Sequence, residues 1–129
     1  MTEDTPTISS YRQLIVWQKS VALATHIYSL TRNFPQEERY GLLSQMRRAA
    51  VSIPSNIAEG RSRNSRKDFI QFLHIALGSV AELETQLEIA MQILYVKKVD
   101  YNEVMAHTMA LKRMLFKMLS SLKAKSQKL

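Results

Sequence analysis

A run of basic residues near the middle of the chain is the feature best suited to binding chemistry. It places four cations close together, Arg61, Arg63, Arg66 and Lys67. Guanidinium and ammonium groups bind phosphate oxygens through charge-assisted hydrogen bonds. No aromatic residue is interleaved with the run, so stacking of unpaired bases is not predicted from it. The run favours contacts to a nucleic-acid backbone, and the alternative is a solvated charged surface.

The overall charge agrees with an anionic partner. Lysine and arginine total 18 against 11 acidic residues, which gives a formal net charge of +7 in 129 residues. A positive balance of this size favours RNA, DNA or an anionic membrane surface as a partner. Many basic proteins bind no particular anion, so charge alone leaves both interpretations open.

Other kinds of chemistry find little support in the sequence. The chain has no cysteine, which excludes disulfides, thiolate zinc sites and a cysteine nucleophile. Spacing along the predicted helices puts His74 and His107 at different levels, so the two cannot share an ion within one subunit. Glu82, Glu84 and Glu88 lie on the flanks of their helix, either solvated or paired with arginines across a subunit boundary. We therefore expect a protein that is not an enzyme and has no metal or cofactor.

The elements that position the basic run are four predicted helices. The first spans Tyr11 to about Arg32, before Phe34-Pro35, and the second starts near Gln36 and ends at Gly60. Ser65 begins a long third helix whose apolar stripe runs to Leu94, and residues 100–103 cap the fourth. Short connections predict an all-α, antiparallel up-down four-helix bundle over residues 11–123. Residues 1–10 are predicted to be a flexible tail and residues 124–129 a basic tail.

In that topology, the second helix ends at the pole where the third begins and the fourth ends. The basic run therefore lies near Lys123 and Lys125, with Glu59 and Asp68 as the main opposing acids. The opposite pole mixes acids and bases and is nearly balanced. The bundle is predicted to have one positive end.

Pro54 lies in the middle of the second predicted helix. A proline removes one backbone hydrogen bond and bends a helix without necessarily ending it. The apolar register continues unchanged from Ile53 to Ile57, and Ser52, Ser55 and Asn56 can bond nearby backbone groups. We interpret SIPSN as a kink in a continuous helix, the alternative being a loop.

The first and fourth helices carry more apolar residues than one buried face needs. In the first, we assign Leu14, Trp17, Val21, Ala24 and Tyr28 to the core stripe. A second stripe is then left on the first helix for contacts with another copy, and the fourth helix carries a similar stripe. The residues that we assign to these two stripes are Val16, Leu23, Ile27, Leu30, Met105, Met109 and Phe116. Exposed apolar stripes mark interaction surfaces, so self-association is predicted. The alternative is an unusually thick core.

The N-terminus, MTEDTPTISS, lacks the positive start and apolar run of a signal peptide. Apolar stretches are interrupted well before the ~18 residues that a membrane span requires. A soluble, cytoplasmic protein that does not bind membranes is expected.

Three segments together resemble one known family: VWQKS, FPQEERYGLLSQMRRAAVSIPSNIAEGRSR and FIQFLHIALGSVAELETQL. They are similar to the four-helix-bundle proteins encoded in intervening sequences of bacterial 23S ribosomal RNA genes, over about residues 11–120. The resemblance implies a ring-shaped homopentamer and no catalytic residues. It also implies structural roles: Gly78 and Ser79 for close helix approach, and Arg48 and Asn56 for tying helix ends or faces together.

Related accessory proteins of diversity-generating retroelements are basic rings that engage nucleic acid and a reverse transcriptase. Taken together, these features predict a homo-oligomeric ring that binds RNA or DNA through a basic rim made of Arg61, Arg63, Arg66, Lys67, Lys123 and Lys125. The alternative is a protein-interaction scaffold or adaptor ring that binds no nucleic acid. A genetic passenger with little activity of its own is a third interpretation.

Overall fold

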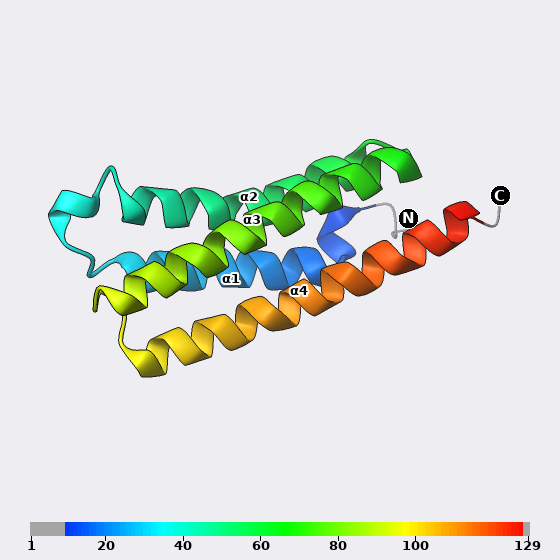
Figure 1. The fold of residues 1–129 in the computed structure, drawn as a ribbon. Coiled ribbons are helices and arrows are strands. Elements are labelled where there is room, and N and C mark those ends of the chain that lie inside the picture. The colour runs from blue at the N-terminus through cyan, green and yellow to red at the C-terminus, as the bar shows by residue number, and fades with distance from the viewer. Residues whose placement is uncertain (1–9, 128–129) are drawn as a thin grey trace.

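The structure is a computed structural model that describes residues 10–127, with side chains up to residue 125. Its four long helices are α1 (Ile15–Thr31), α2 (Leu42–Ser62), α3 (Arg66–Gln92) and α4 (Lys98–Gln127). Two short 3-10 turns, η3 (Tyr11–Gln13) and η4 (Gln36–Glu38), precede α1 and α2. The predicted all-α four-helix bundle is confirmed, and Figure 1 shows consecutive helices running in opposite directions.

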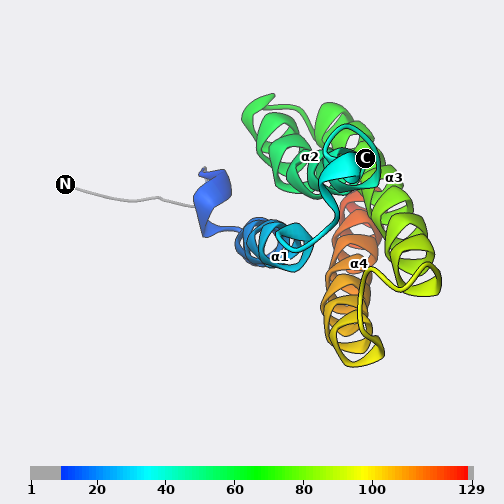
Figure 2. The same ribbon diagram turned by 90° about the vertical axis from the view of Figure 1, so that its left-hand side faces the viewer.

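Each helix packs against the next, and α4 returns to pack against α1. Figure 2, which views the bundle from the end carrying the α1–α2 and α3–α4 connections, shows α1 and α3 diagonally opposed. All four helices contribute to one core, whose largest fully buried side chains are Leu23, Ile27, Met46, Ile53, Ile57, Leu73, Val80, Leu83, Leu87, Val104, Leu111 and Leu115. No helix within residues 10–127 is both long and apolar enough to cross a bilayer.

The core stripe of α1 is only partly the one predicted: Ala24 is buried, and Leu14 and Trp17 pack against the core. Val16, Leu23 and Ile27 are at most 3% exposed, whereas Val21 and Tyr28 are 37% and 42% exposed. Val16, Leu23 and Ile27 belong to the core and cannot also contact a second copy, so this part of the predicted interface is wrong. Among the other predicted interface residues, Leu30 and Met105 pack half-buried against the core, Met109 is half-buried, and Phe116 is 54% exposed.

The buried face of α1 also carries two hydroxyl groups. Ser20 and Thr31 share the buried face, and both are fully inaccessible. Their hydroxyls donate to carbonyl oxygens of their own helix, Ser20 to Trp17 at 2.8 Å and Thr31 to Ile27 at 2.8 Å. A small hydroxyl satisfied in this way can be buried at low cost. The apolar arc of α1 is wide enough for either stripe to be buried, so periodicity alone could not select the face that carries Ser20 and Thr31.

The second helix continues through Pro54, as predicted, and Pro54 itself is buried. Asn56 Nδ2 donates to the Ser52 carbonyl at 2.8 Å and to the Ser52 hydroxyl at 2.9 Å, which supplies local bonds beside the proline. The Ser52 hydroxyl also lies 2.8 Å from that of Ser79, which links α2 to α3. The bend that a proline imposes stays a prediction.

Several predicted boundaries shift. α1 begins at Ile15, because Leu14 is extended, and α2 passes Gly60 and ends at Ser62. α3 ends at Gln92, and Leu94 adopts a left-handed conformation with 87% exposure instead of joining the core stripe. α4 begins at Lys98 and continues to Gln127, so residues 124–127 are helical and not a tail. The predicted N-terminal tail falls outside the described residues except for Ser10, which caps η3.

Glu38 closes the end of the bundle opposite the basic run. Its carboxylate accepts a hydrogen bond from the Leu42 backbone at 2.9 Å, which caps α2 where Gly41 has no side chain to do so. The other oxygen accepts from the Tyr95 hydroxyl at 3.0 Å, which raises the pKa of Tyr95 above 10.0. A Cβ on Gly41 would lie 2.7 Å from the Glu38 carboxylate, so glycine makes room for this cap.

Two glycines inside helices have opposite surroundings. A Cβ on Gly60 would lie 2.6 Å from Phe72 Cβ and 3.2 Å from a ring carbon of Phe69, whereas a Cβ on Gly78 would meet nothing within 4 Å. Gly60, and not Gly78, therefore permits the close approach of α2 and α3. The role that the resemblance implied for Gly78 is wrong within the single chain, because Gly78 is exposed on the outer face of α3.

Replacing each glycine by alanine should change stability in opposite directions. Gly60→Ala should lower the free energy of unfolding by about 1–3 kcal/mol, because α3 must move away from the new methyl group. Gly78→Ala, the matched control, should raise it by about 0.5–1 kcal/mol, because alanine favours an exposed helix more than glycine does. Urea unfolding followed by circular dichroism at fixed protein concentration measures both. A loss of stability in Gly78→Ala would contradict its open surroundings and mean that another copy lies against it.

Candidate nucleic-acid interface

The turn between α2 and α3 presents the basic run at one end of the bundle. Only residues 63–65 separate the two helices. Asn64 has a φ of 59°, a left-handed conformation that asparagine tolerates better than most residues. The Ser65 hydroxyl accepts a hydrogen bond from the Asp68 backbone at 3.2 Å, which confirms the predicted start of α3. This tight turn holds Arg63 and Arg66 on either side of it.

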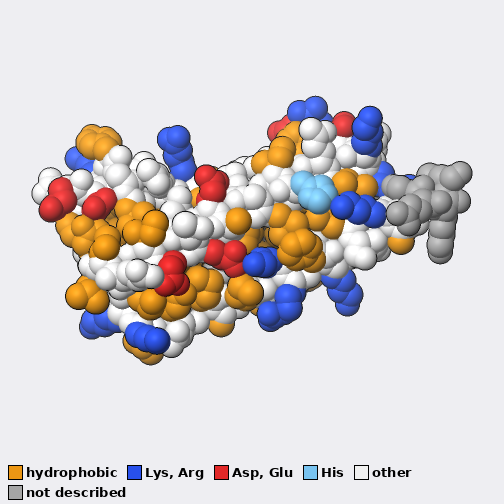
Figure 3. Space-filling view, in the orientation of Figure 1, with side chains coloured by type: hydrophobic (Ala, Val, Ile, Leu, Met, Phe, Trp, Pro, Cys, Tyr) orange, Lys and Arg blue, Asp and Glu red, His pale blue; other side chains and the backbone are white. Residues whose placement is uncertain are grey.

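Residues from three helices meet in one cleft at this end. It has a volume of about 470 Å³, and its basic lining residues are Arg61 from α2, Arg66 from α3 and Lys125 from α4. The apolar floor is formed by Leu14, Gly60, Phe69 and Leu122. Figure 3 shows lysine and arginine side chains gathered at the corresponding right-hand end of the molecule. The sequence correctly predicted that these three cations lie together.

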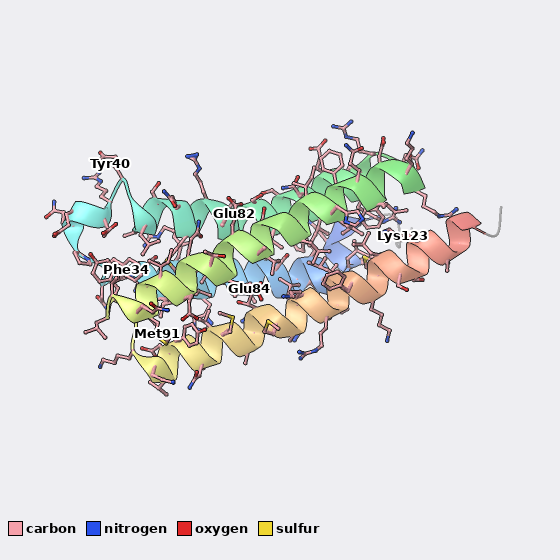
Figure 4. All side chains as sticks on the ribbon, in the orientation of Figure 1. Phe34, Tyr40, Glu82, Glu84, Met91 and Lys123 are labelled. Carbon is pink, nitrogen blue, oxygen red and sulfur yellow. The ribbon has the colours of Figure 1, made fainter. Side chains whose placement is uncertain are left out.

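The remaining predicted cations surround this cleft. Arg66, Lys67, Lys123 and Lys125 are exposed, and Figure 4 shows Lys123 near the C-terminal end of α4. Arg63 is partly engaged: its Nε donates to Glu59 at 2.9 Å, and its guanidinium lies 5.1 Å from the Phe72 ring centroid. An ion pair this exposed contributes little stability and is weakened by salt. We name this group of six cations, Arg61, Arg63, Arg66, Lys67, Lys123 and Lys125, the basic end.

Aromatic rings lie nearer to cations than the sequence indicated. Besides Phe72 beside Arg63, the Arg12 guanidinium lies 5.4 Å from the Trp17 ring centroid and 5.8 Å from that of Tyr11. Trp17 and Phe72 lie outside the basic run, so the run by itself gave no sign of these contacts.

A second basic cluster, which the sequence pattern did not indicate, lies on the outer side of α2. Arg39, Arg47 and Arg48 line a cleft of about 570 Å³ together with Tyr28 and Tyr40. The pair Arg47-Arg48 was visible in the sequence, but Tyr28 had been assigned to the core of α1. Only the rotation of α1 in the folded bundle turns Tyr28 toward these arginines. The role in tying helix faces together that the resemblance implied for Arg48 is not found: Arg48 is exposed and makes no bond to any residue in the described part of the chain.

The acids of α3 are used within the chain. Figure 4 shows Glu82 and Glu84 on different sides of α3. Glu84 accepts from Lys112 of α4 at 3.1 Å, and Glu88 accepts from Gln92 and from Tyr101, each at 2.8 Å. These hydrogen bonds, that of Gln92 first, lower the pKa of Glu88 below 4.5. For Glu84 and Glu88, pairing with arginines of another subunit is therefore not needed.

His26 of α1 and His107 of α4 lie close together in the folded chain. The rings of His26 and His107 have centroids 6.1 Å apart. No cluster of three or more potential metal ligands occurs among the residues that the structure describes. Burial, and then the charge of neighbouring His26, lower the pKa of His107 below its ordinary 6.5.

Stability should therefore decrease on acidification through His107. The folded state binds the proton less readily than the unfolded chain, so the unfolded state is favoured progressively as the pH falls below about 6.5. His107→Gln should flatten this pH dependence between about pH 7 and 5, while the same change at exposed His74 should leave it intact. Urea unfolding across this pH range measures the slope. An unchanged slope in His107→Gln would show that His107 does not sense the pH.

Comparisons with known proteins agree with this fold. The model of the 23S rRNA-intervening sequence protein family matches residues 12–117, which is most of the chain. A crystal structure of a protein of unknown function from the S23 ribosomal protein family of Bacteroides thetaiotaomicron is similar, with 28% identity and a TM-score of 0.77. The comparison covers 82% of this chain and 96% of that one. A search of curated proteins finds no match. Since the match extends over all four helices, the chain belongs to the family of 23S rRNA-intervening sequence proteins.

Proposed function

We propose that this protein is not an enzyme and that it binds the phosphate backbone of RNA or DNA through the basic end, as a ring-shaped homo-oligomer. One observation carries the proposal: Arg61, Arg66 and Lys125, from three different helices, line a single cleft. Three cations brought together by tertiary structure concentrate positive charge where a phosphate can contact more than one of them.

The chemistry of the basic end is that of backbone binding. Exposed lysine and arginine side chains neutralise phosphates and release the counterions condensed on a nucleic acid. Glu59 is already engaged by Arg63, so part of the opposing negative charge is neutralised within the chain. Such contacts position a nucleic acid without reading its sequence. A ring would repeat the basic end around one rim and so multiply the number of phosphate contacts.

The contacts between copies are proposed on the outer faces of α1 and α4. After correction of the α1 stripe, the exposed apolar residues of α1 include Ile15 and Val21, at 54% and 37% exposure. Phe116 of α4 is 54% exposed, with Met109 half-buried on the same flank. A ring needs two different faces that fit each other, and these two helices supply one each.

A second candidate function is an adaptor ring that binds a protein, such as the reverse transcriptase engaged by the related retroelement proteins. One observation favours it: an apolar groove of about 620 Å³ beside the basic end, lined by Ile15, Met114, Met118 and Leu122 among others. Methionine-rich grooves adapt well to apolar partner surfaces. Binding to such a groove should depend only weakly on salt.

Reversing two charges at the basic end should weaken nucleic-acid binding. We expect Arg66→Glu/Lys67→Glu to reduce the slope of log affinity against log salt by about two, since each lost phosphate contact removes about one. Fluorescence anisotropy of labelled duplex DNA and structured RNA across a salt series measures this. The matched control is Lys97→Glu/Lys98→Glu, which makes the same change in charge at the start of α4, at the other end of the bundle.

The outcomes separate the two candidate functions. Equal losses of nucleic-acid affinity in both double variants would mean that the net charge of the protein, and not the basic end, governs binding. Absence of binding by the wild-type protein even at low salt would contradict the nucleic-acid function and leave the adaptor.

Introducing a charge on the proposed contact faces should break the assembly. Val21→Glu and Phe116→Glu should each lower the molar mass measured by light scattering while helicity by circular dichroism is kept, because both positions are exposed within the single chain. Ile89→Glu, at a 46% exposed position on α3, is the control and should leave the mass unchanged. If only Ile89→Glu lowers the molar mass, the contact between copies lies on α3 and not on α1 and α4.

A further inference from the structure

The cleft on the outer side of α2 has an unusual lining for a surface of this bundle. Arg39, Arg47 and Arg48 are its only charged lining residues, and Tyr28 and Tyr40 supply two aromatic rings. Its volume of about 570 Å³ lies within the range of small-ligand sites. None of these residues belongs to the basic end, so this cleft is a separate positive surface.

Arg47 forms a fixed wall of the cleft. Its Nε donates to the Thr31 hydroxyl at 2.9 Å, and its Nη2 donates to the Tyr28 carbonyl at 3.2 Å. The guanidinium also lies 4.4 Å from the centroid of the Tyr28 ring. All these partners are uncharged, so the positive charge of Arg47 is held in place without being neutralised.

Arg48 and Arg39 are available to a ligand. Arg48 is exposed, and its side chain forms no hydrogen bond or ion pair within the described part of the chain. Among the same residues, the Arg39 guanidinium interacts only with the Tyr40 ring, at 5.5 Å from its centroid. The acids closest to the cleft are Glu37 and Glu38, which directly precede Arg39, and Glu82, which lines an adjoining groove with Arg48 and Tyr40. None of these three acids lines the cleft itself. The balance of the cleft is therefore positive.

Tyr40 is the most exposed aromatic residue of this surface, at 87% exposure. Figure 4 shows it at the outer edge of the molecule, just before α2 begins. A ring so exposed contributes almost nothing to the core. Beside unneutralised guanidinium groups, it offers a flat apolar surface on which a base can stack.

We propose that this arginine–tyrosine cleft binds an unpaired nucleotide of a single-stranded nucleic acid. Arg39 and Arg48 contact the phosphates, and the base stacks on Tyr40. A duplex cannot use the site in this way, because its bases are already stacked within the helix. The cleft would thus give single strands a contact that the basic end, which binds backbone alone, does not provide.

The test compares a labelled oligothymidylate with a duplex of equal length, by fluorescence anisotropy at one low salt concentration. Tyr40→Ala should weaken binding of the single strand by about fivefold to a hundredfold, the usual loss of one stacked base. Binding of the duplex should be unchanged. Tyr40→Phe keeps the ring and should retain single-strand affinity, and Arg48→Gln should weaken it. Because Tyr40 and Arg48 are exposed, these variants should fold normally.

Three results would overturn the inference. The first is unchanged single-strand binding in Tyr40→Ala, and the second is an equal loss for single strand and duplex. The third is a change in molar mass of Tyr40→Ala by light scattering, which would make the cleft a contact between copies. The basic-end variant Arg66→Glu/Lys67→Glu, measured in parallel, distinguishes the two proposals. If the basic-end variant loses duplex binding while Tyr40→Ala keeps single-strand binding, this inference alone is refuted. If Tyr40→Ala loses single-strand binding while the basic-end variant keeps duplex binding, the basic-end proposal alone is refuted.

Discussion

The close approach of α2 and α3 at Gly60 is the constraint on which the basic end depends. Phe69 and Phe72 of α3 lie where a side chain at position 60 would otherwise be, so the two helices come together within one turn of their connection. That proximity allows a connection of only three residues. A wider separation would need a longer loop, and Arg61 and Arg66 would no longer line the same cleft.

Buried hydroxyl groups have a similar role elsewhere in the bundle. Ser20, Thr31 and Thr108 are fully buried, and each donates to a carbonyl of its own helix. Because the donor is satisfied locally, the helices need no partner group across the interface at these positions. Two of the buried hydroxyls also join helices: that of Thr31 accepts from Arg47 of α2, and that of Ser79 bonds Ser52.

The distribution of acids explains why positive surfaces survive in the folded chain. Glu38 caps α2, Glu84 binds Lys112, and Glu88 accepts from Tyr101 and Gln92. These carboxylates make their hydrogen bonds to groups other than the arginines of α2. In a chain with a net charge of +7, arginine and lysine side chains therefore gather at two places, the basic end and the cleft beside Tyr40.

The sequence by itself determined the number of helices, their approximate order and the end of the bundle where the basic run lies. These follow from local signals: the Ser65 cap, the Phe34-Pro35 stop, and an apolar register that continues through Pro54. Tertiary structure alone decided which face of α1 is buried, because both of its stripes are apolar enough to be buried against the other helices. The same rotation placed Tyr28 beside Arg47. Periodicity within one helix carries no information about the distance between side chains on different helices, so the cleft that Tyr28 and Arg47 line required the folded chain.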